Sequence, residues 1–290
     1  QPRFTDEYWR DVPDPSIHPA AIGRLWRWDR ESQDDFTATL MHLAHVGAIR
    51  IDAGSYEEPG AFGRMKTVDD YYITRLPAAD NVTDPIDRQA LDLLFGTLAG
   101  GADSLWFGTI KKYGEDHPQE FVDAMQGWQA RFRRRRTARI SSRRKASDTR
   151  LPHRACRGGR FVRCRHLDTH VELHPLIFMI PTAIALGVIG NYMPRRSVKG
   201  NELTAKSKAL RNWLTDFSSL DERPPTDVKV WGEFMVYAYL FGVADQAIKQ
   251  LQTTMPQLFE YDGSMGMTYS ALVVLVHGRP YGCRLSDAFG

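Results

Sequence analysis

The chain has few cysteines and none of the short motifs by which common catalytic sites are recognised. Only three of its 290 residues are cysteine, an odd number that fits no disulfide framework. We therefore expect the folded parts to work in a reducing compartment. The sequence contains no P-loop, GxGxxG, GxSxG or HExxH motif. From these absences we expect no enzyme activity, no cofactor, and no catalytic, cofactor-binding or metal-binding residue that the sequence can name.

One stretch lacks charge altogether. No Asp, Glu, Lys or Arg occurs between Leu173 and Pro194. A helix needs about 20 apolar residues to cross the hydrocarbon core of a bilayer. Arg195 and Arg196 follow directly, as basic residues flank the cytoplasmic end of a membrane helix. We therefore predict a transmembrane helix over residues 173–194, with a buried helix of a soluble protein as the alternative.

Acidic residues are almost missing from a second stretch. Residues 131–165 hold 15 basic residues and one acid, Asp148, whereas residues 1–130 hold 12 basic and 22 acidic residues. Residues 166–290 are nearly balanced, with 11 basic and 12 acidic residues. The formal net charge of +3 therefore comes from one block, and it does not indicate a basic protein as a whole.

This Arg-rich block has three interpretations. It is a nucleic-acid-binding arm, a solvated disordered tail, or a segment translated from a shifted reading frame, and we favour the third. It also contains or adjoins residues of metal-ligand type: His153, Cys156, Cys164, His166, His170 and His174. The two cysteines are eight residues apart, which fits no standard zinc pattern, so we predict no metal site there.

The acidic first part has the element order of a winged helix. We predict a short helix from Pro19, a second helix over 35–46 capped by Asp34, strands over 48–52 and 70–76, and a loop over 56–65 between them. Further helices are predicted after Asp84, which precedes Pro85, and from about Pro118. The second helix carries none of the groove-reading side chains and begins with two aspartates, so we expect protein contact rather than DNA binding.

The part after the uncharged stretch is predicted to be helical. Residues 202–217 have apolar side chains at helical spacing, and residues 228–251 form one long helix or two helices broken at Gly242. Glu233 lies in the apolar first half of that segment and could pair with Lys229. His42 and His45 lie three residues apart on the second helix of the first part, and we interpret both as partly exposed residues without a functional role.

Two blocks resemble a known family. Both are similar to the cytoplasmic part of the YciQ-like predicted bacterial membrane proteins. The first block is DDFTATLMHLAHVGAIRID (34–52), together with YYITRLP and DPIDRQALDLLFGTL, and the second is residues 208–251. The resemblance covers about two thirds of the chain. It implies an ectodomain and a first membrane helix before Gln1, and it implies no activity and no site residue. The chain departs from the family pattern at residues 131–171, where the first arm of a membrane hairpin is expected.

These observations combine into one interpretation. The fold class is mainly α, with a winged-helix-like unit, one transmembrane helix and a C-terminal helical unit. The predicted order is a linker (1–16), the winged-helix-like unit (17–130), an Arg-rich disordered or frame-shifted segment (131–171), the membrane helix (173–194), the helical unit (199–260) and an irregular tail (261–290). We expect a non-enzymatic interaction or scaffold module at the cytoplasmic face of the bacterial inner membrane.

The expected partners are the lipid bilayer and other membrane or cytoplasmic proteins, whereas nucleic acid is not expected. Two alternatives stay open. One is a membrane-tethered winged-helix regulator that binds nucleic acid. The other is an enzyme whose site lies partly in a region before Gln1.

Overall fold

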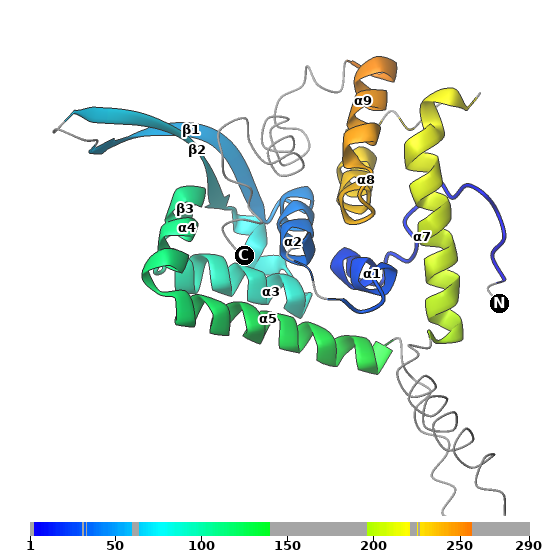
Figure 1. Cartoon of the computed structure of the whole chain (residues 1–290), viewed down its shortest axis with the longest axis horizontal. Coiled ribbons are helices and arrows are strands. Elements are labelled where there is room, and N and C mark those ends of the chain that lie inside the picture. Colours follow the sequence, from blue (N-terminus) through cyan, green and yellow to red (C-terminus); the bar gives the residue numbers. More distant parts are fainter. Residues whose placement is uncertain are drawn as a thin grey trace, which may run out of the picture.

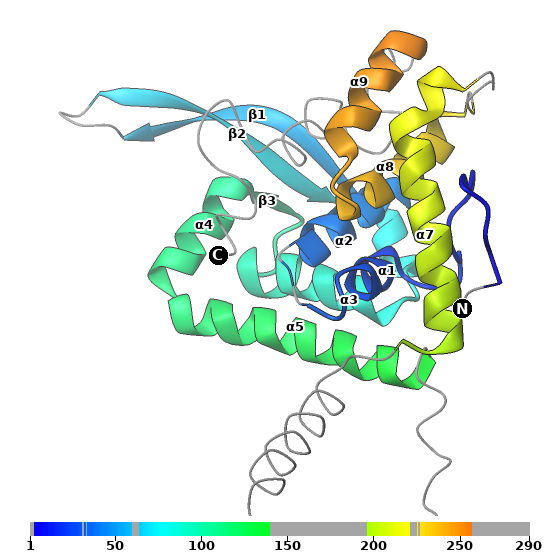
Figure 2. The same ribbon diagram turned by 45° about the vertical axis from the view of Figure 1, so that its right-hand side comes forward.

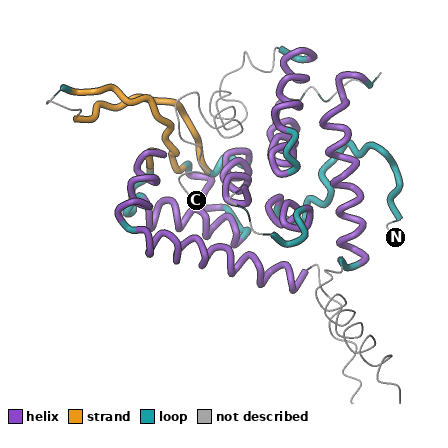
Figure 3. Tube along the Cα trace, viewed as in Figure 1, coloured by secondary structure: helices purple, strands orange, loops and turns teal. Residues whose placement is uncertain are grey.

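The computed structural model of the chain describes residues 3–30, 32, 34–59, 64–139, 196–220, 225 and 227–256. This part is built of helices with one small antiparallel sheet, two strands of which reach away from the helical body (Figures 1 and 3).

The first two helices follow local signals. Helix α1 (Pro19–Trp26) begins with the predicted proline, and the His18 side chain accepts a hydrogen bond from the Ala20 N–H at its start. Helix α2 (Asp34–His45) has two acids in its first turn, where the helix dipole favours negative charge. Both helices therefore begin where the sequence predicted them, within one residue.

The sheet is larger than the sequence indicated. Strand β1 (Ile49–Pro59) pairs with β2 (Met65–Arg75) along its whole length, from Ile49 opposite Arg75 to Pro59 opposite Met65. The short strand β3 (Ser104–Trp106) adds to the inner end of β2. The predicted loop over 56–65 is therefore wrong at both ends, because residues 56–59 and 65 belong to the strands.

The remaining elements of the first part pack around α2 and the sheet, with α3 and α5 below α2 in the view of Figure 1. Asp84 caps α3 as predicted, since its side chain accepts a hydrogen bond from the Ile86 N–H at 2.8 Å. The predicted boundary at residue 130 falls inside a helix, because α5 continues to Arg139. The elements are η2 (Pro77–Asn81), α3 (Pro85–Leu91), the π-helical η3 (Asp92–Leu98), α4 (Phe107–Asp116) and α5 (Pro118–Arg139).

The last part contributes α7 (Val198–Asp216), η4 (Phe217–Ser219), α8 (Val228–Leu240) and α9 (Ala244–Thr254). Of the two alternatives for residues 228–251, one long helix or two helices broken at Gly242, the structure has the second. Gly242 has a φ of 69°, a left-handed conformation that glycine adopts more readily than any other residue. It separates α8 from α9, which then turns back along α7 and α8 (Figure 2).

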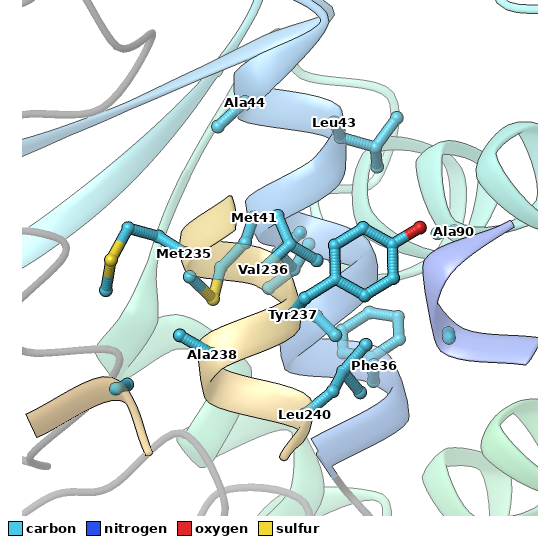
Figure 4. Packing of buried hydrophobic residues seen from close by; sticks show 14 of the residues in the cluster. Phe36, Met41, Leu43, Ala44, Ala90, Met235, Val236, Tyr237, Ala238 and Leu240 are labelled. Atoms are coloured by element: carbon cyan, nitrogen blue, oxygen red, sulfur yellow. The ribbon is translucent and has the colours of Figure 1, made fainter. Parts of the chain in front are cut away.

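Helix α2 lies at the centre of the packing. It contacts α1, α3, α8 and β1, and one hydrophobic cluster extends from Val12 to Met255. Figure 4 shows Phe36 and Met41 of α2 gathered with the side chains of α8, among them Tyr237. Residues 3–16, predicted as a linker, lie beside α7, where the Arg3 N–H donates to the Glu202 carboxylate at 2.8 Å.

The predicted fold class with one transmembrane helix is corrected by this arrangement. Among the described residues, no helix is both long enough and apolar enough to cross a membrane. The most apolar helix, α8, has 13 residues, fewer than the roughly 20 that a span needs, and it packs on α2. The predicted span at 173–194 lies outside the described residues, as do residues 140–171 of the Arg-rich segment.

The winged-helix interpretation is corrected as well. A recognition helix must present one face to a nucleic-acid groove. Helix α2 does not, because every residue from Asp35 to Met41 is buried against its neighbours. The predicted wing is a pair of 11-residue strands. The described part is a helical body with a three-stranded sheet, and the nucleic-acid alternative loses the structural feature on which it depended.

Candidate functional site

The first candidate site is the outer part of the β1–β2 hairpin, which we call the arm (residues 52–59 and 64–72). Only the inner end of the hairpin enters the core, through Ile49, Ile51 and Ile73. Beyond it, one face of the arm is polar and exposed, and the tip carries Met65 with 59% of its surface exposed. That face carries Ser55, Glu57, Thr67 and Asp69, together with the exposed apolar residues Ala53, Pro59 and Met65. The arm therefore presents backbone and side chains well away from the body (Figure 1).

Aromatic packing holds the other face of the arm. The Trp106 ring lies 5.0 Å from the ring of Tyr56 and 5.2 Å from that of Tyr72, measured between centroids. Gly54 lies beneath the same indole, where a Cβ atom would come within 2.9 Å of it. The position therefore requires glycine, and the base of the arm is fixed to the β3–α4 corner.

A buried carboxylate strengthens this corner. Asp70 of β2 accepts a hydrogen bond from the Gly108 N–H at 2.7 Å. Trp106, the N-cap residue of α4, makes no capping bond of its own, so Asp70 supplies the missing acceptor across the chain. The arm and α4 are thus joined by both apolar and polar contacts.

The second candidate site is a polar cluster where α1, α2 and α3 meet, formed by His18, His42 and Asp87. His18 Nε2 lies 2.9 Å from Asp87 Oδ1, and His42 Nε2 lies 3.6 Å from Asp87 Oδ2. The side chains of His18 and Asp87 are 3% and 4% exposed, and that of His42 is 19% exposed. The two imidazole rings meet edge to face, with centroids 5.0 Å apart.

The surroundings of His42 lower its pKa and so disfavour protonation of its imidazole. The pKa of His42 is lowered to about 4, chiefly by burial and also by the neighbouring His18 and His45, against the opposing effect of Asp87 and Asp84. His18 accepts the Ala20 N–H on Nδ1 at 3.3 Å. Its proton is therefore on Nε2, from which it donates to Asp87. With a pKa of about 4, the His42 imidazole is neutral at pH 7.

The residues of the cluster are also of metal-ligand type. One ligand atom from each of His18, His42 and Asp87 can be chosen so that all three lie within 4.8 Å of one another. Two imidazole nitrogens and a carboxylate oxygen are a donor set that zinc and similar divalent metals use.

A sequence comparison decides the family. The family described as "Predicted membrane protein (DUF2207) C-terminal domain" matches residues 5–251. The chain belongs to this family. Its members are described as membrane proteins, which confirms the resemblance drawn from the two sequence blocks and supports membrane association of the DUF2207 chain. No match was found among curated proteins or among solved structures.

The histidine pair of the DUF2207 chain is divided between two environments. His42 points to His18 and Asp87, whereas the His45 ring lies against α8, where a Cβ on Gly232 would come within 2.8 Å of its Nδ1. Burial and the nearby charge of Lys229 lower the pKa of His45. The interpretation that both were partly exposed near a helix end is right about exposure, but it missed that His42 joins a cluster.

Glu233 lies on α8 as predicted, in a partly buried place. Burial raises its pKa, and the charge of Asp11 raises it further. The residues of metal-ligand type in the Arg-rich segment, from His153 to His174, lie outside the described residues. Sequence reasoning missed His18 and Asp87. Nothing in the sequence local to either residue indicates that they meet.

Proposed function

We propose that this DUF2207 chain is a non-enzymatic interaction module of a bacterial membrane protein, acting at the cytoplasmic face of the inner membrane, and that the arm is its docking surface. The observation that carries the proposal is the arm itself. The hairpin consists of eleven residue pairs, but only its inner end contributes to the core.

The cost of such a structure supports a role in binding. A two-stranded hairpin is at best marginally stable in water. An exposed strand edge is also a hazard, because it pairs readily with other chains. The chain nevertheless fixes the arm through Trp106 and Asp70. Rigid presentation of an open strand edge is the geometry by which proteins bind an extended peptide segment.

The chemistry of the arm favours a protein partner. Its exposed face carries hydroxyl and carboxylate groups, which are unsuited to insertion into hydrocarbon. Residues 1–130 hold ten more acidic than basic residues, and this charge repels nucleic-acid phosphates. A polar segment of another protein, with basic side chains opposite Glu57 and Asp69, fits the arm best.

Site-specific photocrosslinking in the native membrane tests the proposal. A photoreactive amino acid is placed at Glu57 on the arm and, as a matched control, at Glu120, an exposed glutamate on α5. We expect a discrete protein adduct from position 57 and none from position 120. Adducts of equal yield from both positions, or no protein adduct from the arm, would overturn the proposal.

A shortened chain separates docking from stability. Replacing residues 57–67 by Asn-Gly closes the hairpin just beyond the Tyr56–Val68 pair and leaves the Trp106 contacts in place. We expect the helical body to keep its thermal midpoint while the adduct, followed from a probe at Ser55, disappears. An adduct that persists in the shortened chain would show that the tip of the arm is not the binding element.

A further inference from the structure

His42 is a partly buried imidazole without a normal hydrogen bond among the described residues. Its Nδ1 is buried and has no partner there, and its Nε2 lies 3.6 Å from Asp87, longer than a hydrogen bond. Buried polar groups in native proteins are nearly always paired, so an unpaired one calls for an explanation. A ligand that binds at Nε2 gives that nitrogen a partner, and Nδ1 then carries the ring proton.

The surroundings of His42 Nε2 define what that ligand is. Asp87 is a carboxylate with almost no exposure, and His18 is buried on its other side. No Lys or Arg forms an ion pair with Asp87 among the ion pairs of the described residues, where its partners are the two histidines. A divalent cation would satisfy the carboxylate and both imidazoles at once.

The two histidine–carboxylate distances are close to those around a tetrahedral metal, and the ligand atoms of the two imidazoles lie within 4.8 Å of each other. Zinc lies about 2.0–2.2 Å from nitrogen and oxygen ligands, so neighbouring ligand atoms in a tetrahedron are roughly 3.3–3.6 Å apart. The separation of 3.6 Å between His42 and Asp87 is already in this range, and that of 2.9 Å between His18 and Asp87 needs to open by roughly half an ångström. The partial exposure of His42 leaves a side from which a water completes the coordination.

Metal binding requires one rearrangement. A metal on His18 Nε2 needs the lone pair there, so the proton moves to Nδ1 and the ring gives up the hydrogen bond from the Ala20 N–H. That bond is long, at 3.3 Å, and the ring has to shift so that the protonated Nδ1 no longer faces the Ala20 N–H. A structural metal contributes far more than one such bond. The number of protons on the ring is unchanged.

We propose that His18, His42 and Asp87 form a binding site for a divalent transition metal of the zinc class, which joins α1, α2 and α3. The three ligands come from three different helices, so the metal acts as a cross-link within the body. This inference is independent of the arm, since the cluster and the arm share no residue.

Cobalt substitution tests the site directly. The full chain is prepared with Cys156, Cys164 and Cys283 replaced by serine, so that thiolates elsewhere cannot bind the probe. We expect one Co²⁺ per chain with the visible absorption of a tetrahedral nitrogen and oxygen site and no thiolate charge-transfer band, displaced by Zn²⁺. Zn²⁺ is expected to raise the thermal midpoint of the same protein.

Two variants and one control decide the outcome. His42→Asn and Asp87→Asn are each expected to weaken Co²⁺ binding at least roughly 10-fold, and Asp87→Asn keeps an acceptor for His18 if His42→Asn fails to fold. His45→Asn, on the same helix but outside the cluster, is expected to bind as the parent does. Binding that is absent in the parent, or equal in Asp87→Asn and in the parent, would overturn the proposal.

Discussion

The junction where α1, α2 and α3 meet and the arm place their charged side chains in opposite environments. Charged groups such as Arg24 and Asp35 are buried in the junction, whereas most of those on the arm are exposed to solvent. In the junction, Asp35 is 1% exposed and pairs with Arg24, which is 4% exposed, at 3.1 Å, and also with Arg27. At the base of the arm, the shorter contact of 2.6 Å joins Arg50, which is 54% exposed, to the partly exposed carboxylate of Asp52. An Arg–Asp pair therefore has a structural role in the junction, whereas at the arm it has only a small effect on the free energy of unfolding.

The difference shows that a short distance between two charged groups does not by itself indicate a strong contribution to stability. Burial raises the pKa of Asp35 in spite of the two neighbouring guanidinium groups. The cost of desolvation therefore exceeds the attraction of the pair, as is common for buried ion pairs. Such a pair contributes little as a whole, but removal of one member leaves a buried charge without its partner.

The largest expected effect is that of Asp35→Ala. This change leaves Arg24 buried without its carboxylate, and we expect a loss of about 3–5 kcal/mol in the free energy of unfolding. Chemical denaturation of both proteins at pH 7 measures it. Asp52→Ala on the arm is the matched control, with an expected loss of at most about 1 kcal/mol. Equal losses in the two variants would contradict the comparison.

The next effect is a dependence on pH that comes from the junction. His42 has a pKa of about 4 in the folded chain and an ordinary value of 6.5 when unfolded. Between these values only the unfolded chain takes up the proton, so stability falls as the pH falls from about 6.5 to about 4. The full loss is roughly 3 kcal/mol.

Denaturation profiles with a chelator present, compared between the parent and His42→Asn, isolate this effect from other titrations. The stability advantage of the parent over the variant is expected to shrink as the pH falls. Parallel profiles across this range would show that His42 is not the group responsible.

A smaller effect is expected at the anchor of the arm. Trp106→Ala removes the ring that packs on Tyr56 and Tyr72, with an expected loss of about 2 kcal/mol because the indole is partly exposed. Hydrogen exchange is expected to quicken in β1 and β2 and to stay slow in α2. Val122→Ala, an exposed change on α5, serves as the control. Faster exchange throughout the body would mean that the arm and the core are not separable.

The smallest effect is expected at the tip. Met65→Ser replaces an exposed side chain that packs on nothing in the core, so the free energy of unfolding is expected to change by no more than about 0.5 kcal/mol. If the arm binds a partner, the crosslinking yield from position 57 is nevertheless expected to fall. A large loss of stability would show that the tip packs against the body in solution.

Much of the helical structure was predictable because its signals are local. Pro19 and Asp84 mark helix starts, and Gly242 separates α8 from α9. The hairpin was underestimated for a physical reason. Its outer part is rich in Gly, Glu and Pro, which have low β-propensity, and it is held in the sheet by pairing with β2 and by Trp106, about 50 residues away in the sequence.

The sequence by itself determined the family, the charge asymmetry and most helix positions, because each depends on residue types or on spacings of a few residues. The tertiary structure alone decided that α8 covers α2, that the hairpin becomes an arm, and that His18 meets Asp87, a residue 69 positions away. Contacts of this kind depend on how several apolar faces pack together, and no short stretch of sequence contains that information.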